Sequence, residues 1–167
     1  MNAPARYHDL IDYLSFLGAR FDIDMPARQP WRTGARSRGG EAERMPVIAA
    51  ASLWVKPLPG DICVLVVVPA GRSPTDRGLQ VGFGQFRRAG RDEVLALSAG
   101  VAPEALPPFG WPYLPGVAKV VVDREIVEAQ LVVFNAATLD HKMFMTGHEF
   151  KAALGAFELL GASPPLA

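Results

Sequence analysis

Residues 62–68 read Ile-Cys-Val-Leu-Val-Val-Val, a run in which every side chain is apolar. A strand of this composition buries both of its faces, so the run predicts a strand at the centre of a covered sheet. Residues 47–55 also contain β-branched side chains, and Pro-Leu-Pro-Gly-Asp at residues 57–61 carries turn chemistry. Together these segments predict a β-hairpin.

Other segments are also strand-like. Residues 79–87 place apolar and small or polar side chains in alternation, and residues 21–25 alternate apolar with acidic ones, as a short edge strand does. Residues 117–122 and 126–134 are rich in valine and predict two more strands. A helix over residues 124–137 is an alternative for the last segment, because its first half contains helix formers.

Three segments predict helices. In residues 6–17 apolar side chains recur at steps of three and four, and residues 91–99 form a shorter candidate. Thr146 opens a capping box before an apolar run at residues 150–160, which Gly161 ends. The predicted fold class is therefore α+β, an antiparallel sheet of about five strands with an N-terminal helix, a short middle helix and a C-terminal helix.

The composition limits the class of protein. The 167 residues contain 17 basic and 17 acidic side chains, which argues against a uniformly charged surface for a polyelectrolyte. The single cysteine, Cys63, excludes an internal disulfide framework and is expected to be a buried, unreactive core residue. No apolar run is long enough for a membrane span, and residues 1–10 lack the apolar core of a signal peptide. We therefore expect one cytoplasmic domain over residues 1–167.

Residues 26–46 have no apolar period and are rich in arginine, proline and glycine, which predicts a long loop or arm. Mobile arginines neutralise phosphates and an aromatic ring can stack on a base, so nucleic-acid binding through residues 28–44 is one possible function. The candidate contacts are Arg28, Trp31, Arg32, Arg36 and Arg38. A high-GC genome also favours arginine over lysine, which is a compositional explanation of the same residues.

The sequence contains no recognisable catalytic motif. Asp140, His141 and His148 form the single cluster with metal-ligand residue types, but the seven-residue spacing of the histidines does not place them on one helical face. Neither a nucleophile elbow nor a phosphate-binding glycine loop occurs. We therefore expect no metal, no cofactor and no enzymatic activity, and an enzyme of unrecognised type remains an alternative.

Residues 107–115 place Phe109, Trp111 and Tyr113 on a proline-rich backbone. A stiff loop loses little conformational entropy on docking, so these aromatics are candidate contacts for a protein partner. Equally, they can cap the core of the domain itself.

The order of the predicted elements resembles the fold of class I type III secretion chaperones, the CesT/Tir family, and of the bacterial YbjN-like family. The residues that carry the resemblance are 10–18, which look like the opening helix, and 117–134 and 146–160, which are similar to the final strand pair and closing helix. The resemblance implies a non-catalytic homodimer that binds a partner protein, with Val94, Leu95 and Leu97 as candidate residues of the dimer interface. These three residues can equally belong to the core of the domain. We therefore expect a chaperone or adaptor that acts in a larger assembly.

Overall fold

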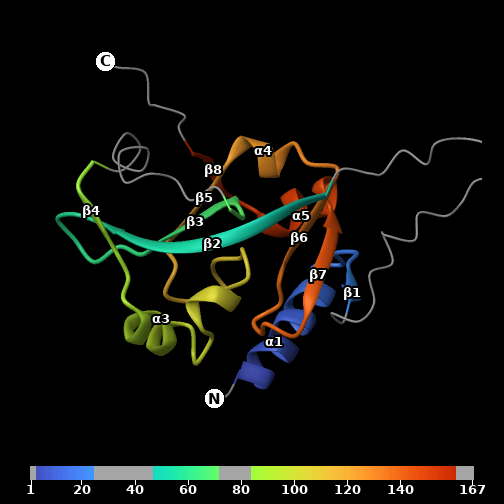
Figure 1. The fold of residues 1–167 in the computed structure, drawn as a ribbon, viewed down its shortest axis with the longest axis horizontal. Coiled ribbons are helices and arrows are strands. Elements are labelled where there is room, and N and C mark those ends of the chain that lie inside the picture. Colours follow the sequence, from blue (N-terminus) through green and yellow to red (C-terminus); the bar gives the residue numbers. More distant parts are fainter. Residues whose placement is uncertain (1–2, 25–46, 72–83, 161–167) are drawn as a thin grey trace, which may run out of the picture.

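The computed structural model describes residues 3–24, 47–71 and 84–160. In these residues the strands follow the order β1-β7-β6-β2-β3-β5-β8, and β4 also pairs with β2 (Figure 1). The strands are β1 (Asp22–Asp24), β2 (Val47–Pro57), β3 (Val64–Pro69), β4 (Phe86–Arg88), β5 (Lys119–Val122), β6 (Leu131–Asn135), β7 (Lys142–Thr146) and β8 (Glu158–Leu159). The helices are α1 (Ala3–Phe16), α3 (Arg91–Leu97), α4 (Arg124–Val127), α5 (Gly147–Leu154) and the 3-10 helix η1 (Pro103–Ala105).

The predicted hairpin is confirmed, and it lies at the centre of the sheet. β2 and β3 pair antiparallel from Ala50 opposite Pro69 to Val55 opposite Val64. All six residues of β3 are buried, as the apolar run predicted. Cys63, which precedes β3, is also buried, so the expectation of a core cysteine is confirmed.

The α+β composition is confirmed, but the expectation of an antiparallel sheet of about five strands is wrong. The described residues form eight strands, and β2–β6, β3–β5 and β5–β8 are parallel pairs. Parallel neighbours need long crossover connections, and here the chain from β3 to β5 spans residues 70–118. Strand periodicity does not reveal the direction of a neighbour, so the sequence patterns left this open.

Two predicted boundaries are corrected. The segment 126–134 is neither one strand nor one helix, because the Asp123 side chain accepts a hydrogen bond from Glu125 N and caps α4 before β6 begins. The C-terminal helix starts as predicted, since Thr146 Oγ1 accepts from Glu149 N. It ends at Leu154 because Gly155 adopts a φ of 66°, and the chain then forms β8.

Two strand assignments involve the edges of the sheet. The short edge strand predicted at 21–25 is present as β1, which pairs antiparallel with β7. β7 was not predicted. Of the strand predicted at 79–87, the structure describes residues 84–87 alone, and the last two of these belong to β4.

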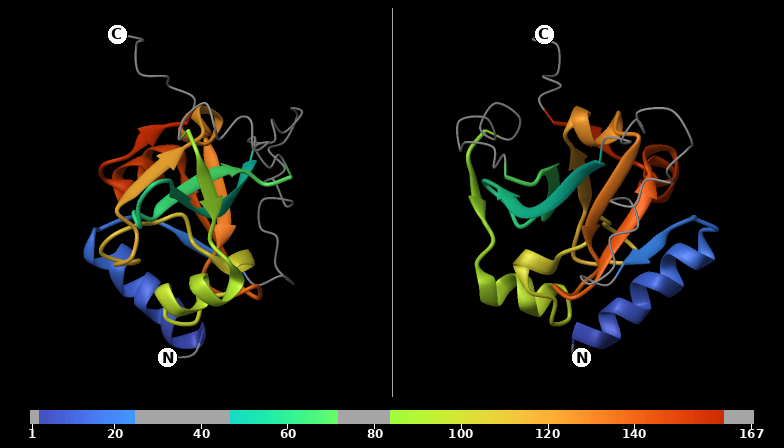
Figure 2. Two further views of the ribbon diagram at one scale, coloured as in Figure 1. Left: turned by 90° about the vertical axis from the view of Figure 1, so that its left-hand side faces the viewer. Right: turned by 45° about the vertical axis from the view of Figure 1, so that its right-hand side comes forward.

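The buried apolar side chains of α1, α3, α4 and α5 all belong to one core cluster, and the second cluster contains no helical residue. In both views of Figure 2, α1 and α3 lie below the strands and α4 lies above them. Leu10 and Leu14 are fully buried on the inner face of α1, as the helical period predicted. Phe109, Phe134 and Phe150 meet in the same core, with ring centroids 5.3 to 6.1 Å apart.

A buried cation holds α1 to the loop before β5. The Arg6 guanidinium lies 4.4 Å from the ring centroid of Tyr113 and donates to the Tyr113 backbone carbonyl, while Tyr113 Oη donates to Arg6 O over 3.1 Å. Arg6 Nη1 also pairs with Asp9 at 2.9 Å. Burial raises the pKa of the Tyr113 phenol, so this group stays protonated.

No helix within residues 3–24, 47–71 and 84–160 is long and apolar enough to cross a membrane.

We predict that Gly147→Ala destabilises the protein by about 1–3 kcal/mol, because the added Cβ would lie 1.8 Å from the carbonyl oxygen of Ala129. The control is Gly90→Ala, where a Cβ meets no atom within 4 Å. Urea unfolding monitored by circular dichroism measures both variants. Equal stability of the two would contradict the close approach of α5 to Ala129.

Candidate ligand-binding cavity

β2 loses its strand partner on one side over the middle of its length. It pairs with β3 continuously, but its other edge pairs with β6 over residues 47–49 and with β4 over residues 55–57. Among the described residues, no strand adjoins residues 50–54 on that edge. The sheet therefore has a gap between β6 and β4.

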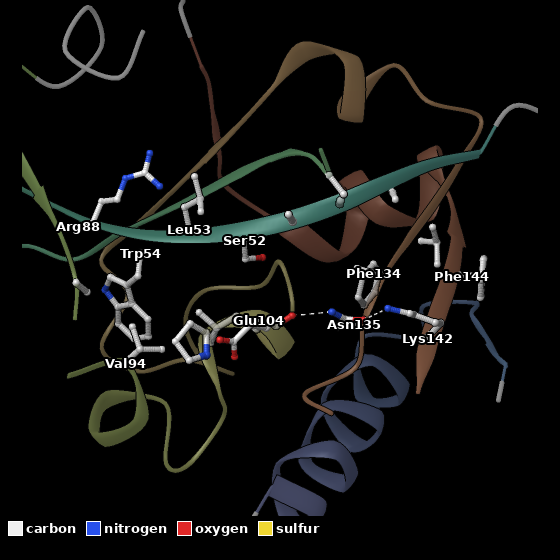
Figure 3. Close-up of a pocket in the computed structure, with 18 of the residues that line it drawn as sticks. Ser52, Leu53, Trp54, Arg88, Val94, Glu104, Phe134, Asn135, Lys142 and Phe144 are labelled. Carbon is white, nitrogen blue, oxygen red and sulfur yellow. Dashed lines mark hydrogen bonds between the residues drawn. The ribbon is translucent and has the colours of Figure 1, made fainter. Parts of the chain in front are cut away.

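A cavity of about 690 Å³ lies at this gap (Figure 3). Figure 3 shows Ser52 and Trp54 pointing from β2 toward η1, whereas Leu53 points to the opposite face, and all three line the cavity. Because neighbouring side chains of a strand point to opposite faces, the cavity must extend around the unpaired edge of β2. Its volume is in the range of small-molecule sites, roughly 300–1,000 Å³.

Most of the cavity wall is apolar, and polar or charged side chains of β2, β4, η1, β6 and β7 line the rest. Val94 of α3, Leu106 after η1 and Phe134 of β6 contribute apolar side chains. Asn135 and Lys142, which are opposed in the β6–β7 ladder, contribute an amide and an ammonium group. A cavity with this distribution suits a ligand with an apolar body and a polar end.

The polar side chains are held in a hydrogen-bonded chain. Lys142 Nζ donates to Asn135 Oδ1, and Asn135 Nδ2 donates to the backbone carbonyl of Glu104 over 2.6 Å (Figure 3). This chain fixes the end of β6 to η1. The Glu104 carboxylate accepts from Arg91 at 2.6 Å, and hydrogen bonds from its own backbone N–H and from Arg91 lower its pKa.

Lys142 places an ammonium group in the wall of the cavity. Its hydrogen bond to Asn135 uses one of its three N–H donors, and none of the carboxylate side chains that the structure describes forms an ion pair with it. An ammonium group in this state can bind an anionic group of a ligand.

Two buried polar atoms on β2 have no hydrogen-bond partner among the described residues. They are Ser52 Oγ and Trp54 Nε1, and the Trp54 side chain is 4% exposed. A buried donor without a partner costs about 1–3 kcal/mol. The β2 wall of the cavity therefore contains polar atoms whose hydrogen bonds are not made by the described residues.

An ion-pair cluster fixes the opposite wall. The Glu93 carboxylate of α3 accepts from Arg87 of β4 at 2.8 and 3.0 Å and pairs with Lys56 of β2 at 2.5 Å. Hydrogen bonds first from Arg87 and then from Lys56 lower the pKa of Glu93 to about 2. The cluster joins α3 and β4 to β2, so it sets the position of the wall that carries Val94.

The candidate partner residues occupy different environments. Phe109, Tyr113 and Val94 are buried, and the side chains of the two aromatics pack in the core of this chain. Leu95 is half-buried. Trp111 is 72% exposed and Leu97 is 37% exposed, so these two have the largest side-chain surface available to a partner.

The structure does not bring the predicted histidine cluster together. His141 stacks on Tyr7 with ring centroids 4.4 Å apart, and its Nδ1 lies 2.9 Å from Thr138 Oγ1. His148 lies in the first turn of α5, after the Thr146 cap. The described residues contain no group of three or more potential metal ligands. The arginine-rich arm, with Arg28, Trp31, Arg32, Arg36 and Arg38, lies outside the described residues.

The sequence patterns did not identify the polar residues that line the cavity, namely Ser52, Arg88, Glu104, Asn135 and Lys142. Each is a polar side chain within or beside an apolar segment, and no spacing rule connects them. The weak signal that was present is the pair Asn135 and Lys142, which are polar residues at the two sides of a turn between apolar strands.

No family model matches the chain, and no curated protein matches it. Solved structures do match. The "hypothetical protein APE2540" is similar over 90% of this chain and 96% of its own, with a TM-score of 0.65 and 19% identity. A "putative trans-editing enzyme for prolyl tRNA synthetase" is similar over 94% of both chains, with a TM-score of 0.62 and 17% identity.

A "putative signal transduction protein" from Marinobacter aquaeolei VT8 matches over 90% of this chain, with a TM-score of 0.62 and 16% identity. The chain spans 29% of the length of that protein. At these identities the matches establish a shared fold. The descriptions of these three neighbours name no type III secretion chaperone, so that resemblance stays a prediction.

We predict that Glu93→Gln lowers the free energy of unfolding at neutral pH but not at about pH 2. The native pKa of Glu93 is below its ordinary value of 4.5, so the ion-pair cluster contributes stability above pH 4.5 and loses it as the pH falls toward 2. Urea unfolding of both proteins across this range measures the difference. Glu128→Gln, which removes an exposed pair with Arg124, is the control with little expected effect. A difference that does not change with pH would contradict the role of Glu93.

Proposed function

We propose that this protein binds a small acyl group, carried on a phosphate-bearing molecule, in the cavity between β2, β6 and η1. The observation that supports this most is the Lys142 ammonium in the wall of an otherwise mostly apolar cavity. The proposal contains no catalytic step, in keeping with the expectation that the protein is not an enzyme.

The shape and chemistry of the cavity support an acyl ligand. Val94, Leu106 and Phe134 offer apolar surface to an acyl chain, and burial of an apolar chain contributes about 0.8 kcal/mol for each CH₂ group. The polar chain from Lys142 through Asn135 to η1 lies along one part of the wall, so the ligand has one apolar and one polar end.

The charges favour an aminoacyl ligand within this class. Lys142 can bind a phosphate, and the Glu104 carboxylate, which also lines the cavity, can accept a hydrogen bond from an ammonium group in addition to its ion pair with Arg91. A neighbour of the same fold is described as a trans-editing enzyme for prolyl tRNA synthetase, and editing sites select aminoacyl groups by size. The aminoacyl end of a transfer RNA is therefore the ligand that we propose.

We predict that wild-type protein binds 3′-(leucylamino)-3′-deoxyadenosine 5′-phosphate, a stable amide analogue of an aminoacyl end. Lys142→Met should weaken this binding about 10-fold or more, because a hydrogen bond to a charged group contributes about 1.5–3 kcal/mol. Isothermal titration calorimetry measures the affinity. The control variant is Lys151→Met, which removes an exposed lysine of α5 that does not line the cavity. This variant should bind the probe with the affinity of the wild type. Absence of wild-type binding, or equal binding by Lys142→Met, would refute the proposal.

Protein binding by an adaptor is a second candidate function, favoured by Trp111. This side chain is 72% exposed, while Phe109 and Tyr113 on either side of it are buried. The two hydrogen bonds between Arg6 and Tyr113 hold the loop, so Trp111 projects from a fixed backbone. A large aromatic on a fixed loop is a common anchor at protein interfaces.

If this second function is correct and the partner is another copy of the chain, the wild type should form a homodimer that Trp111→Ser weakens. Hot-spot residues contribute about 2 kcal/mol or more, so the dissociation constant should rise about 30-fold. Light scattering over a concentration series measures it, and Phe16→Ser, which removes another exposed aromatic, is the control. A wild type that stays monomeric at every concentration would rule out the homodimer.

A further inference from the structure

The main-chain groups of Ser52 face the gap in the sheet. On β2, Ala49 O accepts from Ala70 N on the β3 side over 2.7 Å, whereas Trp54 O accepts from Ala89 N on the β4 side over 2.9 Å. The β2–β3 register is continuous, so main-chain groups alternate between the two sides without a bulge. Ser52 is two residues from Trp54, and its N–H and C=O therefore point to the side of β6 and β4.

Neither flanking strand reaches Ser52. The parallel ladder with β6 stops at Ala49, and the antiparallel ladder with β4 starts at Val55. Ser52 lines the cavity at this position, and its side-chain oxygen has no hydrogen-bond partner among the described residues. Main-chain groups in proteins are nearly always paired, so the Ser52 N–H and C=O, which no described strand pairs, offer a binding site beside the cavity.

One residue of a bound molecule is enough to pair both groups. In a hydrogen-bonded pair of antiparallel strands, two opposed residues exchange both of their N–H···O=C bonds. We infer that an aminoacyl group binds to Ser52 in this way, as a single residue of the missing strand. The Ser52 N–H donates to the carbonyl oxygen of the ligand, and the Ser52 C=O accepts from its α-amino group.

This inference rests on the proposed aminoacyl ligand and specifies how the ligand is recognised. Edge pairing of this kind is how many domains bind extended peptides, but the gap here is bounded by β6 and β4. The chain Lys142–Asn135–Glu104 lies beside the gap on the β6 side, so the phosphate-bearing part of the ligand extends toward Lys142. The main-chain pairing then selects α-amino acyl groups over acyl groups that lack the amine.

The test compares two variants at one position. Ser52→Pro removes the N–H, and proline is tolerated in strands where that N–H is not part of a ladder. Ser52→Ala keeps the N–H and removes the hydroxyl. We expect Ser52→Pro to weaken binding of 3′-(leucylamino)-3′-deoxyadenosine 5′-phosphate about 10-fold and Ser52→Ala to change it less than about 3-fold, in line with one hydrogen bond of about 1.5 kcal/mol.

A second probe tests the other hydrogen bond. In this probe a 4-methylpentanoyl group replaces the leucyl group, so the two probes differ in the α-amine and in nothing else. The second probe should bind the wild type about 10-fold more weakly than the leucyl probe does. If Ser52→Pro does not fold, amide hydrogen exchange of the wild type gives the same information. A hydrogen bond from the Ser52 N–H to the bound leucyl probe should slow the exchange of that N–H. Unchanged exchange at Ser52 in the bound state overturns the inference.

The outcomes separate this inference from the proposed function. No wild-type binding of the leucyl probe overturns both. Binding that Lys142→Met weakens, but that Ser52→Pro and loss of the α-amine leave unchanged, overturns the main-chain recognition and leaves the cavity proposal in place. If Lys142→Met, Ser52→Pro and loss of the α-amine each weaken binding, both the cavity proposal and the main-chain recognition are supported.

Discussion

The hydrogen bonding of β2 is interrupted in the middle of one edge, and this interruption determines where the cavity lies. β2 is paired along its whole centre with β3, yet it shares its second edge between β6 at one end and β4 at the other. A strand placed between these two would fill the sheet and remove the cavity. The gap therefore creates the cavity and places the Ser52 main chain, which no described strand pairs, beside the apolar wall.

Separate polar contacts keep the two sides of the gap apart. On one side, Lys142, Asn135 and the Glu104 carbonyl tie the β6–β7 hairpin to η1. On the other, Glu93 joins α3 to β2 and β4 through Lys56 and Arg87. Both sets of contacts use charged or amide groups, whereas the core beneath is formed by packed phenylalanines and by leucines of α1. A rigid core with polar supports at the rim is suited to a preformed site.

The sequence predicted the elements that depend on local patterns. The apolar run around Val66 gave the central strand, the steps of Leu10 and Leu14 gave α1, and Thr146 gave the start of α5. It could not predict the parallel partners of β2 and β3, since pairing direction depends on residues far apart in the chain. The cavity follows from this pairing, so Ser52 carried no signal of its own, and Asn135 and Lys142 carried a weak one.

The most direct test of the account is an amide chemical-shift titration of the isotopically labelled protein with 3′-(leucylamino)-3′-deoxyadenosine 5′-phosphate. We predict that the shifts concentrate at the gap, on Ser52, Glu104, Asn135 and Lys142, and that Trp111 and the exposed face of α1 do not change. Shifts confined to residues outside the cavity, or no shifts at saturating probe, would contradict it.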